Sequence, residues 1–422
     1  MEIPKMARVR QNFPAAVPLN ISFELSKGFA PILPRIEKGA SIAVGVGSRG
    51  ISNLSSIVRA VLDILRKAGA KPFIFPAMGS HGGATPEGQT EVLASYGITE
   101  ANMGVPIRAS MEVREIGLAE CGARVFASVA ALEADHIILI NRIKPHTDFF
   151  GPLGSGLVKM SVIGLGKKVG AESMHGAASR LGHERVIRDM ARVALTKTPI
   201  LCGVAILEDQ RHATAALEVI PASEIEARED PLLERARALM PRLPFEEIDL
   251  LIVDRIGKNI SGAGLDPNVI GRGVNGYLSS LAREGRSAPF IRRIFVRNLT
   301  PETHGNAIGI GMADITTTRA VKSIDLNITY TNALTALTPQ SAKIPIYFET
   351  DRECIQRALA SLAIEDTSAA RVVRVADTLN LQNIEISQSL AAEKHSGLIV
   401  ESAYEPMLFN FDGNLTKDVP IA

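Results

Sequence analysis

Four side chains in the first half of the sequence have the types and the setting that acid–base and nucleophilic chemistry require. They are His81, His146, Lys159 and His175, and three of them lie within residues 141–175. Imidazoles transfer protons near neutral pH, and an amine set among apolar residues becomes a nucleophile when its pKa falls. We interpret the four as one site, although each of them taken alone also fits an ordinary surface position.

Two of these histidines directly follow short apolar runs that are typical of buried strands. His81 lies in GSHGG after the run at 71–77, and His146 lies in KPHTD after the run Ile137–Ile140. Ligands of open α/β sheets bind at the carboxyl ends of the strands. Both imidazoles are therefore expected at one edge of a sheet.

A third polar segment, which contains Ser48 and Arg49, follows the apolar run at 41–47. Residues 45–50 match GxGxxG, but the next strand lacks the terminal acidic residue that binds a ribose hydroxyl. A standard dinucleotide site is therefore not expected. The planar guanidinium of Arg49 is better suited to a carboxylate or a phosphate, with a surface ion pair as the alternative.

The histidine spacing does not predict a metal site made by the protein alone. His175 and His183 are eight residues apart, which does not place both rings on one helix face as HxxxH would, and no acidic cluster adds ligands. A metal here would need a non-protein ligand. Lys167 and Lys168 in GLGKK are expected as helix-surface charges, because the spacing of a P-loop is absent.

The composition excludes several other classes of function. The 422 residues include 46 Lys+Arg and 45 Asp+Glu, without the basic excess that nucleic acid or a membrane surface requires. Three widely spaced cysteines form no CxxC pair. The N-terminal residues lack the apolar core of a signal peptide, and no run of eighteen apolar residues predicts a membrane span. We therefore expect a cytoplasmic protein.

Strands that alternate with helices predict an α/β fold with mostly parallel sheets flanked by helices. A helix with apolar residues at helical spacing is expected over 54–70, and a second helix is expected from near Ser155, loosened around Gly164 and Gly166. Strands of the first half are expected within 41–47, 71–77, 134–145, 200–209 and 214–222.

Two domains are expected at this chain length. The strand–helix alternation restarts at Ile248 after a proline-bounded helix. We predict an N-terminal α/β domain over 1–245 that carries the four side chains, and a C-terminal α/β domain over 246–395 that closes an active site in the cleft between the domains. The tail 396–422 is expected to pack back on the N-terminal domain.

The order of these motifs resembles the nickel-dependent lactate racemase family. The shared elements are SRG after the first strand, GSHGG after the second, a PH motif, and GSGLVK with a histidine sixteen residues after its lysine. The match covers about the first 180 residues by motif and the remainder by architecture. The resemblance implies a nickel pincer nucleotide, which is a pyridinium mononucleotide with two thiocarbonyl arms.

The resemblance also assigns roles to the four side chains. It implies that Lys159 binds one arm of the cofactor covalently and that His175 is the protein ligand of nickel. His81 and His146 would then be the acid and base on either side of the substrate. A soft, square-planar nickel site needs only one protein ligand when the cofactor supplies sulfur and carbon.

Outside these four positions the chain matches the family less closely. Ser48 and Arg49 are expected at the cofactor, and Arg49 aligns with the family's substrate-binding arginine, but the acidic residue three positions earlier is Val46 here. The family's glutamine–lysine pair of the second domain is missing, and Lys258 and Asn259 are expected to replace it at the substrate. These departures put lactate itself in doubt and leave open a larger or differently charged 2-hydroxy acid.

The resulting hypothesis is a racemase or epimerase of a 2-hydroxy acid, loaded by cofactor-synthesis enzymes. Hydride would pass reversibly between the hydroxyl-bearing carbon and the cofactor, while two histidines exchange the hydroxyl proton. Two rival hypotheses stay open. One is a nickel-independent isomerase or lyase that uses Lys159 and the histidines, and the other is a non-catalytic protein that binds an anion or a nucleotide at Arg49.

Overall fold

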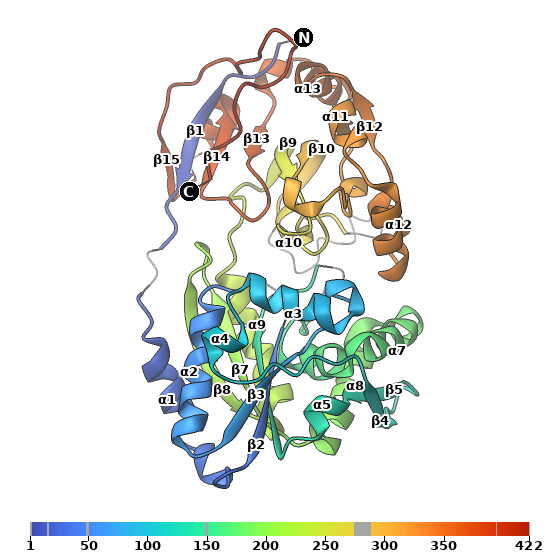
Figure 1. The fold of residues 1–422 in the computed structure, drawn as a ribbon. Helices are drawn as coiled ribbons and strands as arrows, with labels where there is room; N and C mark the ends of the chain where they lie inside the picture. The colour runs from blue at the N-terminus through green and yellow to red at the C-terminus, as the bar shows by residue number, and fades with distance from the viewer. Residues whose placement is uncertain are drawn as a thin grey trace. The chain divides into compact units, whose positions relative to one another are not determined.

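The computed structural model describes residues 2–14, 17–47, 50–147, 151–273, 288–393 and 395–421. These residues form two compact units, each built around its own sheet (Figure 1). The five-stranded unit covers Ala15–Met240, and the eight-stranded unit covers Met1–Pro14 together with Pro241–Ala422.

The sheet of the five-stranded unit has the strand order β3-β2-β6-β7-β8. Its first four strands are parallel, and β8 is antiparallel to β7. A separate antiparallel hairpin is formed by β4 and β5. The strands of this unit are β2 (Ser41–Val46), β3 (Lys71–Pro76), β4 (Val113–Leu118), β5 (Arg124–Ser128), β6 (His136–Arg142), β7 (Ile200–Glu208) and β8 (Thr214–Pro221).

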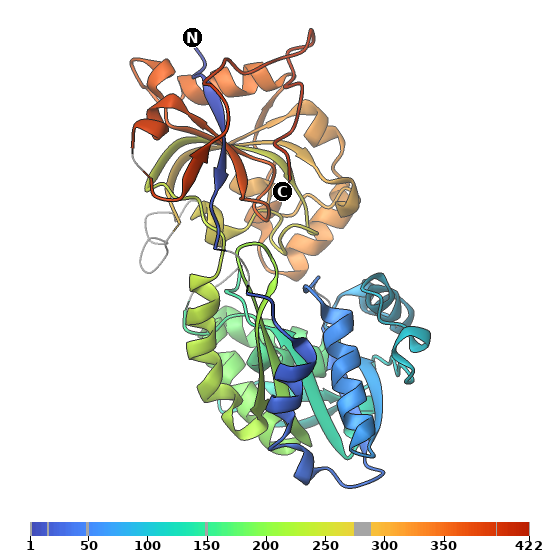
Figure 2. The ribbon, with the colours of Figure 1, turned by 90° about the vertical axis from the view of Figure 1, so that its left-hand side faces the viewer.

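Helices cover both faces of this sheet (Figure 2). The α-helices are α1 (Ile21–Phe29), α2 (Leu54–Lys67), α3 (Pro86–Ser95), α4 (Glu100–Met103), α5 (Val129–Leu132), α6 (Leu157–Lys159), α7 (Leu165–Leu181), α8 (His183–Lys197) and α9 (Ile225–Ala238). A π-helix, η3 (Met160–Gly164), joins α6 to α7, and the 3₁₀ turns are η1 (Leu33–Arg35), η2 (Gly82–Ala84) and η4 (Ala222–Glu224).

The run Ile137–Ile140 shows why these sequences form buried strands. Ile138 and Ile140 belong to the core that contains α1 and α2, whereas Ile137 and Leu139 belong to the core that contains α8. All four side chains are fully buried. Successive strand residues point to opposite faces, so a strand covered on both faces needs an uninterrupted apolar run.

The sheet of the eight-stranded unit has the order β12-β11-β10-β9-β13-β14-β1-β15. The strands from β12 to β13 are parallel, and the last three are antiparallel to their neighbours. The strands of this sheet are β1 (Met6–Gln11), β9 (Glu247–Ile256), β10 (Phe290–Leu299), β11 (Ile315–Thr317), β12 (Ile346–Phe348), β13 (Val372–Val375), β14 (Asn383–Ser387) and β15 (Leu398–Val400).

The helices of this unit are α10 (Pro267–Ile270), α11 (Thr318–Lys322), α12 (Leu326–Thr335), α13 (Asp351–Ala360) and α14 (Gln388–Ala392), with 3₁₀ turns η6 (Pro301–Thr303), η7 (Ile310–Met312), η8 (Pro339–Ala342) and η9 (Thr367–Ala369).

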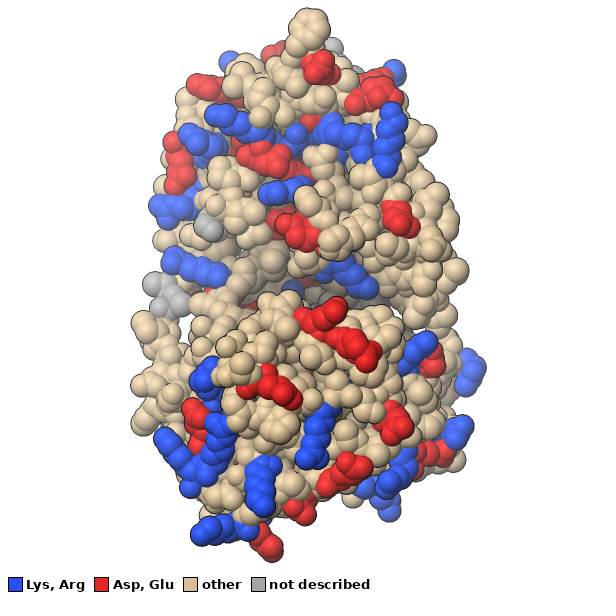
Figure 3. Space-filling model, viewed as in Figure 1, with Lys and Arg blue, Asp and Glu red and all other residues tan. Residues whose placement is uncertain are grey.

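The predicted fold class is confirmed, because the chain forms two mixed, mostly parallel sheets flanked by helices. The placement of an active site in a cleft between the domains stays a prediction. In the part of the chain that the structure describes, no helix has the length and apolar character that crossing a bilayer would require. Basic and acidic side chains are interspersed on the face of each unit that Figure 3 shows.

The structure corrects the expected assignment of both chain ends. β1 pairs with β14 and β15, so residues 1–14 belong to the eight-stranded unit and not to the first domain. The tail 396–422, expected on the N-terminal domain, supplies β15 and belongs to the same eight-stranded unit. Strand pairing across almost the whole chain length has no local sequence signal, which is why the sequence did not reveal it.

A buried network of ion pairs attaches the tail to this sheet. The Arg297 guanidinium, 4% exposed, lies 2.7 Å from Asp254, 2.9 Å from Asp351 and 2.8 Å from Asp418 of the tail. Arg374 binds the same Asp254 at 2.9 Å. Each buried charge therefore has several partners of opposite sign, which offsets the loss of hydration.

Replacing Arg297 with Met should lower the free energy of unfolding by about 3–5 kcal/mol, because it removes one of the two arginine counter-charges from each of the buried carboxylates of Asp254 and Asp351. Chemical denaturation measures the change. The matched control is Arg10→Met, since Arg10 pairs with Glu401 at 2.7 Å on the surface of the same unit. That control should cost less than about 1 kcal/mol. Equal losses in the two variants would contradict the structural role of the network.

Candidate active site

The loops that follow β2 and β6 lie where the strand order of the five-stranded sheet reverses. From β2 the chain continues to β3 on one side and later returns to β6 on the other side of β2. Ligands of open α/β sheets bind outside the carboxyl ends of the strands at such a point. The end of β6 contacts the loop after β2, since Arg142 Nη1 donates a hydrogen bond to the Gly50 carbonyl at 3.4 Å. The topology therefore predicts a ligand site here.

The loop that carries His146 is closed by backbone pairing. Lys144 and Ser155 exchange two backbone hydrogen bonds of 2.8 and 2.7 Å. The Asn141 side chain, near the end of β6, donates to the Gly156 carbonyl at 2.8 Å. These bonds fix the start of α6 beside the end of β6, although the two segments are more than ten residues apart in the sequence.

Two glycines allow this close approach. A Cβ atom added at Gly154 would lie 2.5 Å from the Lys144 carbonyl oxygen, and one added at Gly156 would lie 2.5 Å from the Glu229 carboxylate carbon. Neither position has room for a side chain. Glu229 is itself buried and accepts a hydrogen bond of 2.8 Å from the Val158 N–H. An acidic side chain of α9 therefore caps the helical segment that carries Lys159.

Lys159 and His146 are brought into direct contact, with Lys159 Nζ hydrogen-bonded to His146 Nε2. Both side chains are half-buried. Such a bond needs a proton on one nitrogen and a lone pair on the other. At least one of the two groups therefore faces its partner in the unprotonated form that a base or a nucleophile requires.

The helix that follows Lys159 bends sharply at Lys167, where φ is 56° and ψ is −156°. Eight residues of uninterrupted helix span about 12 Å. Here, however, a Cβ added at Gly170 would lie 3.0 Å from the Val162 carbonyl oxygen, so the chain folds back on itself. A backbone conformation of this kind is largely restricted to glycine and costs about 1–3 kcal/mol in other residues.

The bend determines how His175 relates to Lys159. An uninterrupted helix would separate these residues by about 24 Å. Lys167 lies at the midpoint of that segment, so folding back brings its two ends closer together. The half-buried His175 ring lies edge-to-face with His183, at 6.3 Å between ring centroids.

His81 lies in the loop between β3 and η2, and this loop packs on the bent helix. A Cβ added at Gly79 would lie 3.1 Å from the Ile163 side chain and 3.5 Å from Ala171. Ile163 and Ala171 lie on either side of the bend. The His81 loop therefore contacts both arms of the helix that carries Lys159 and His175.

The structure does not test whether the remaining predicted residues belong to this site. Ser48 and Arg49 lie outside the described residues. Lys258 and Asn259 follow β9 in the eight-stranded unit. There Lys258 Nζ donates to Asn332 Oδ1 at 3.0 Å, and Asn259 Oδ1 accepts a 2.6 Å hydrogen bond from the Thr300 hydroxyl. Their role at a substrate stays a prediction.

The expectation that Lys167 is a helix-surface charge is wrong. Its side chain is 1% exposed, and its ammonium donates to the Pro76 carbonyl at 2.7 Å and to Gln89 Oε1 at 2.6 Å. The expectation holds for the exposed Lys168, which lies 3.8 Å from Glu172. The error arose because the break was expected at Gly164 and Gly166, whereas the bend at Lys167 turns that side chain inward. Gln89 and Glu229 were also missed, and neither has a sequence signal that would have found it.

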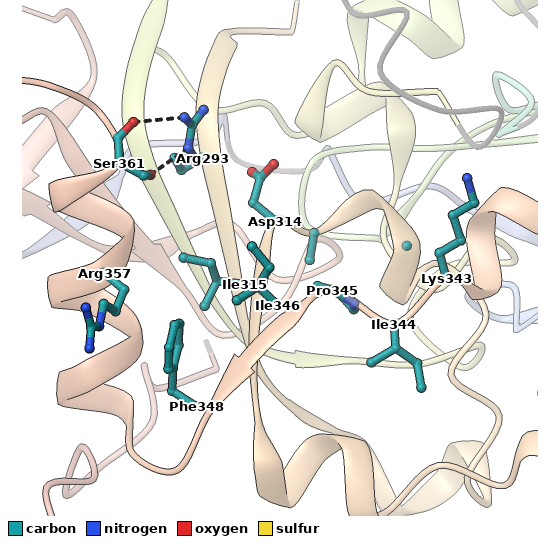
Figure 4. Close-up of a pocket in the computed structure, with 12 residues that line it drawn as sticks. Arg293, Asp314, Ile315, Lys343, Ile344, Pro345, Ile346, Phe348, Arg357 and Ser361 are labelled. Atoms are coloured by element: carbon teal, nitrogen blue, oxygen red, sulfur yellow. Dashed lines mark hydrogen bonds between the residues drawn. The ribbon is translucent and has the colours of Figure 1, made fainter.

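The eight-stranded unit contains a pocket of about 700 Å³, but it holds none of the predicted site residues (Figure 4). It lies at the amino-terminal ends of β11 and β12, opposite to the end at which ligands of such sheets bind. Two of its charged groups are engaged in the fold: Arg293 donates to Ser361 Oγ at 2.8 Å, and Asp314 pairs with Arg272 at 2.7 Å. We therefore do not assign this pocket as the active site.

No cluster of three or more His, Cys, Asp or Glu side chains suited to a metal ion occurs among the residues that the structure describes. The role of His175 as a metal ligand stays a prediction.

Comparison with known proteins identifies the fold. Neither a protein-family model nor a curated protein matches the sequence. The structure is similar to the lactate racemase apoprotein of Thermoanaerobacterium thermosaccharolyticum, with 15% identity and a TM-score of 0.53 over 88% of this chain and 99% of that chain. It is also similar to a protein of Thermotoga maritima, with 12% identity and a TM-score of 0.52 over 82% of this chain and 92% of that chain. The resemblance to lactate racemases is thus confirmed at the level of the fold.

The pH dependence of stability should report on Glu229. Burial raises the pKa of this carboxyl group from 4.5 to about 7, Asp230 adds to the rise, and the N–H groups of Val158 and Leu157 and the Arg188 charge oppose it. Between pH 4.5 and 7 the folded chain then binds more protons than the unfolded chain, so the free energy of unfolding falls as pH rises. The total fall is at most about 3 kcal/mol.

Glu229→Gln should remove this slope from denaturation curves recorded across that pH range. The control is Glu234→Gln on the same helix, an exposed residue paired with Arg237, which should keep the slope. A wild-type slope in Glu229→Gln would show that another group titrates.

Proposed function

We propose that this protein is a racemase or epimerase of a 2-hydroxy acid that works with a nickel pincer nucleotide. The observation that carries the proposal is the contact between Lys159 Nζ and His146 Nε2 beside the switch point of the five-stranded sheet. The fold supports it, because the lactate racemase apoprotein has a similar structure. The substrate class follows from the family resemblance of the motifs around these residues.

The residues present fit such a cofactor. The described side chains offer no complete metal site of their own, whereas a pincer nucleotide brings sulfur and carbon ligands and needs one imidazole from the protein. Lys159 would hold the nucleotide covalently, and His175 would ligate the nickel. When bound, the nucleotide supplies a hydride acceptor for the carbon that bears the substrate hydroxyl.

His146 would act as one of two proton-transfer groups. A covalent bond at the Lys159 nitrogen would replace an ammonium with an uncharged group next to Nε2. The lone pair of Nε2 would then be available to the substrate hydroxyl, because the ammonium, which is the stronger hydrogen-bond donor, is no longer there. It would accept the hydroxyl proton as hydride leaves the neighbouring carbon and return it in the reverse step.

His81 would serve the mirror-image alcohol from the opposite side. Its loop contacts both arms of the bent helix, so it lies next to the segments that carry Lys159 and His175. A planar 2-keto acid between two imidazoles accepts hydride on either face, which is what racemisation requires. Arg49 would bind the substrate carboxylate beside Ser48 at the cofactor, and Lys258 and Asn259 would contact the substrate from the eight-stranded unit.

The same contact also favours a second candidate function, a nickel-independent isomerase or lyase. His146 would take a proton from Lys159, and the neutral amine would add to a substrate carbonyl, releasing water to form an imine. A third candidate, a non-catalytic protein that binds an anion or nucleotide at Arg49, does not need this contact. The first experiment below separates the three.

Cofactor loading should depend on Lys159 and His175 in different ways. Chain produced together with the cofactor-building enzymes should carry a covalent adduct by intact mass and near-stoichiometric nickel. Lys159→Ala should lose the adduct, because its nitrogen forms the bond, and His175→Ala should keep the adduct but lose nickel. The control, Lys168→Ala, should lose neither.

Absence of both nickel and adduct from wild-type chain made in cofactor-loaded cells would contradict the proposal. Borohydride trapping of a substrate carbonyl on Lys159 would then support the second function. Nucleotide binding that survives loss of all three histidines would support the third.

His146 and His81 should each act on a different enantiomer of the substrate. His146→Asn and His81→Asn should each slow oxidation of one enantiomer about 10²–10⁴-fold more than the other, because each imidazole serves one face. Acid-quenched single turnovers with each enantiomer of lactate and of larger 2-hydroxy acids, analysed for the 2-keto acid, measure this. His136→Asn, at the opposite end of β6, is the control and should match wild type. Equal slowing of both enantiomers in both variants would rule out the two-base arrangement.

A further inference from the structure

Lys167 combines two properties that are each unusual. Its backbone lies in a left-handed region that favours glycine, although the chain places glycines at 164, 166 and 170 around it. Its side chain is also almost fully buried, which is rare for lysine. Strain of this kind persists only where surrounding contacts hold it in place, so its contacts indicate its function.

The ammonium of Lys167 is held by two oxygens of other elements. It donates to the carbonyl of Pro76, the last residue of β3, at 2.7 Å and to Gln89 Oε1 on α3 at 2.6 Å. No carboxylate contributes to these bonds. Burial lowers the pKa of Lys167 to about 8, so the charge is largely kept at neutral pH. The bend is therefore tied to the end of β3 and to α3.

Gln89 continues these bonds to the loop of His81. Its fully buried side-chain amide donates to the carbonyls of Met78 at 3.3 Å, Gly79 at 3.0 Å and His81 at 3.3 Å. The side-chain amide of Gln89 thus binds the backbone of the loop from Met78 to His81. Its oxygen is meanwhile oriented by Lys167.

The same loop also rests directly on the backbone of α3. A Cβ added at Gly82 would lie 2.3 Å from the Gly88 carbonyl carbon, and one added at Gly88 would lie 2.1 Å from the Gly82 oxygen. Gly79 meets the bent helix on the other side. The loop is therefore enclosed between α3 and the bent helix, and Lys167 and Gln89 are the polar link across that enclosure.

We infer that Lys167 and Gln89 are positioning residues that tie the His81 loop to the bend and so set the imidazole of His81 relative to the helix arms that carry Lys159 and His175. The inference rests on the proposed function for its catalytic meaning. The hydrogen bonds from Lys167 through Gln89 to the loop are a property of the fold. Their effect on the loop can be measured in protein that has no enzymatic activity. Gln89 binds the backbone of the loop, and Lys167 binds Gln89 and the end of β3, so both residues act through the residues they hold.

Three variants separate the contributions of the Lys167 ammonium, the strained Lys167 backbone and the amide donors of Gln89. Lys167→Met keeps a side chain at the strained position and removes the ammonium. Lys167→Gly removes both the ammonium and the strain. Gln89→Glu keeps an oxygen for Lys167 but removes the donors to the loop carbonyls. Lys168→Met, one residue away on the exposed side of the same helix, is the matched control.

The first measurement is hydrogen exchange of peptides covering residues 77–85, together with the NMR titration of the His81 imidazole. Lys167→Met and Gln89→Glu should lower protection of these amides at least about tenfold and shift the His81 titration, while β7 keeps its protection. Lys167→Gly should show the same loss of protection although its backbone is relaxed. Lys168→Met should match wild type in both measurements.

The second measurement uses loaded enzyme. Gln89→Glu should retain the Lys159 adduct and nickel and lower kcat at least about tenfold with little change in KM, because the base and not the binding surface is displaced. Wild-type exchange and a wild-type His81 titration in both Lys167→Met and Gln89→Glu would overturn the inference. If one of these variants fails to fold, the other and Lys167→Gly decide. A wild-type chain that never loads nickel would contradict the proposed function but would leave the exchange result unaffected.

Discussion

The bend at Lys167 is the constraint on which the arrangement of the candidate site depends. A straight helix would carry His175 far from Lys159, and the segment would then pass the His81 loop on one arm only. The bend requires an unfavourable backbone conformation, which the Lys167 ammonium stabilises by bonding to Pro76 and Gln89. The stabilising group is buried and charged. The geometry of the bend is therefore set by directional hydrogen bonds as well as by apolar packing.

Close backbone approach is the second physical feature of the site. Gly154 and Gly156 let the loop after β6 meet the start of α6, and Gly82 and Gly88 let the His81 loop meet α3. At each contact, two backbone segments meet at a distance that a side chain would not allow. For the proposed function, these contacts matter because proton transfer between a base and a substrate hydroxyl requires well-positioned imidazoles.

The likeness to the lactate racemase apoprotein at 15% identity is understandable on the same basis. A sheet covered on both faces needs apolar runs of the correct length and period, and many residues of similar volume satisfy that need. Catalysis depends instead on the positions of a few functional groups. In the proposed function those groups are Lys159, which contacts His146, and the two histidines of the bent helix and the loop that packs on it.

The sequence by itself determined the fold class, the five strands of the first sheet but not the hairpin of β4 and β5, and His81, His146, Lys159 and His175 as the candidate residues. These features are visible because apolar periodicity and strand-end motifs are local. Tertiary structure alone decided that Lys159 meets His146, that Lys167 is buried at the bend, and that both chain ends belong to the eight-stranded unit. Each of these depends on partners that are distant in the chain, such as Gln89 for Lys167 and β14 for β1. Neighbouring residues do not encode which distant group a side chain or a strand edge will meet.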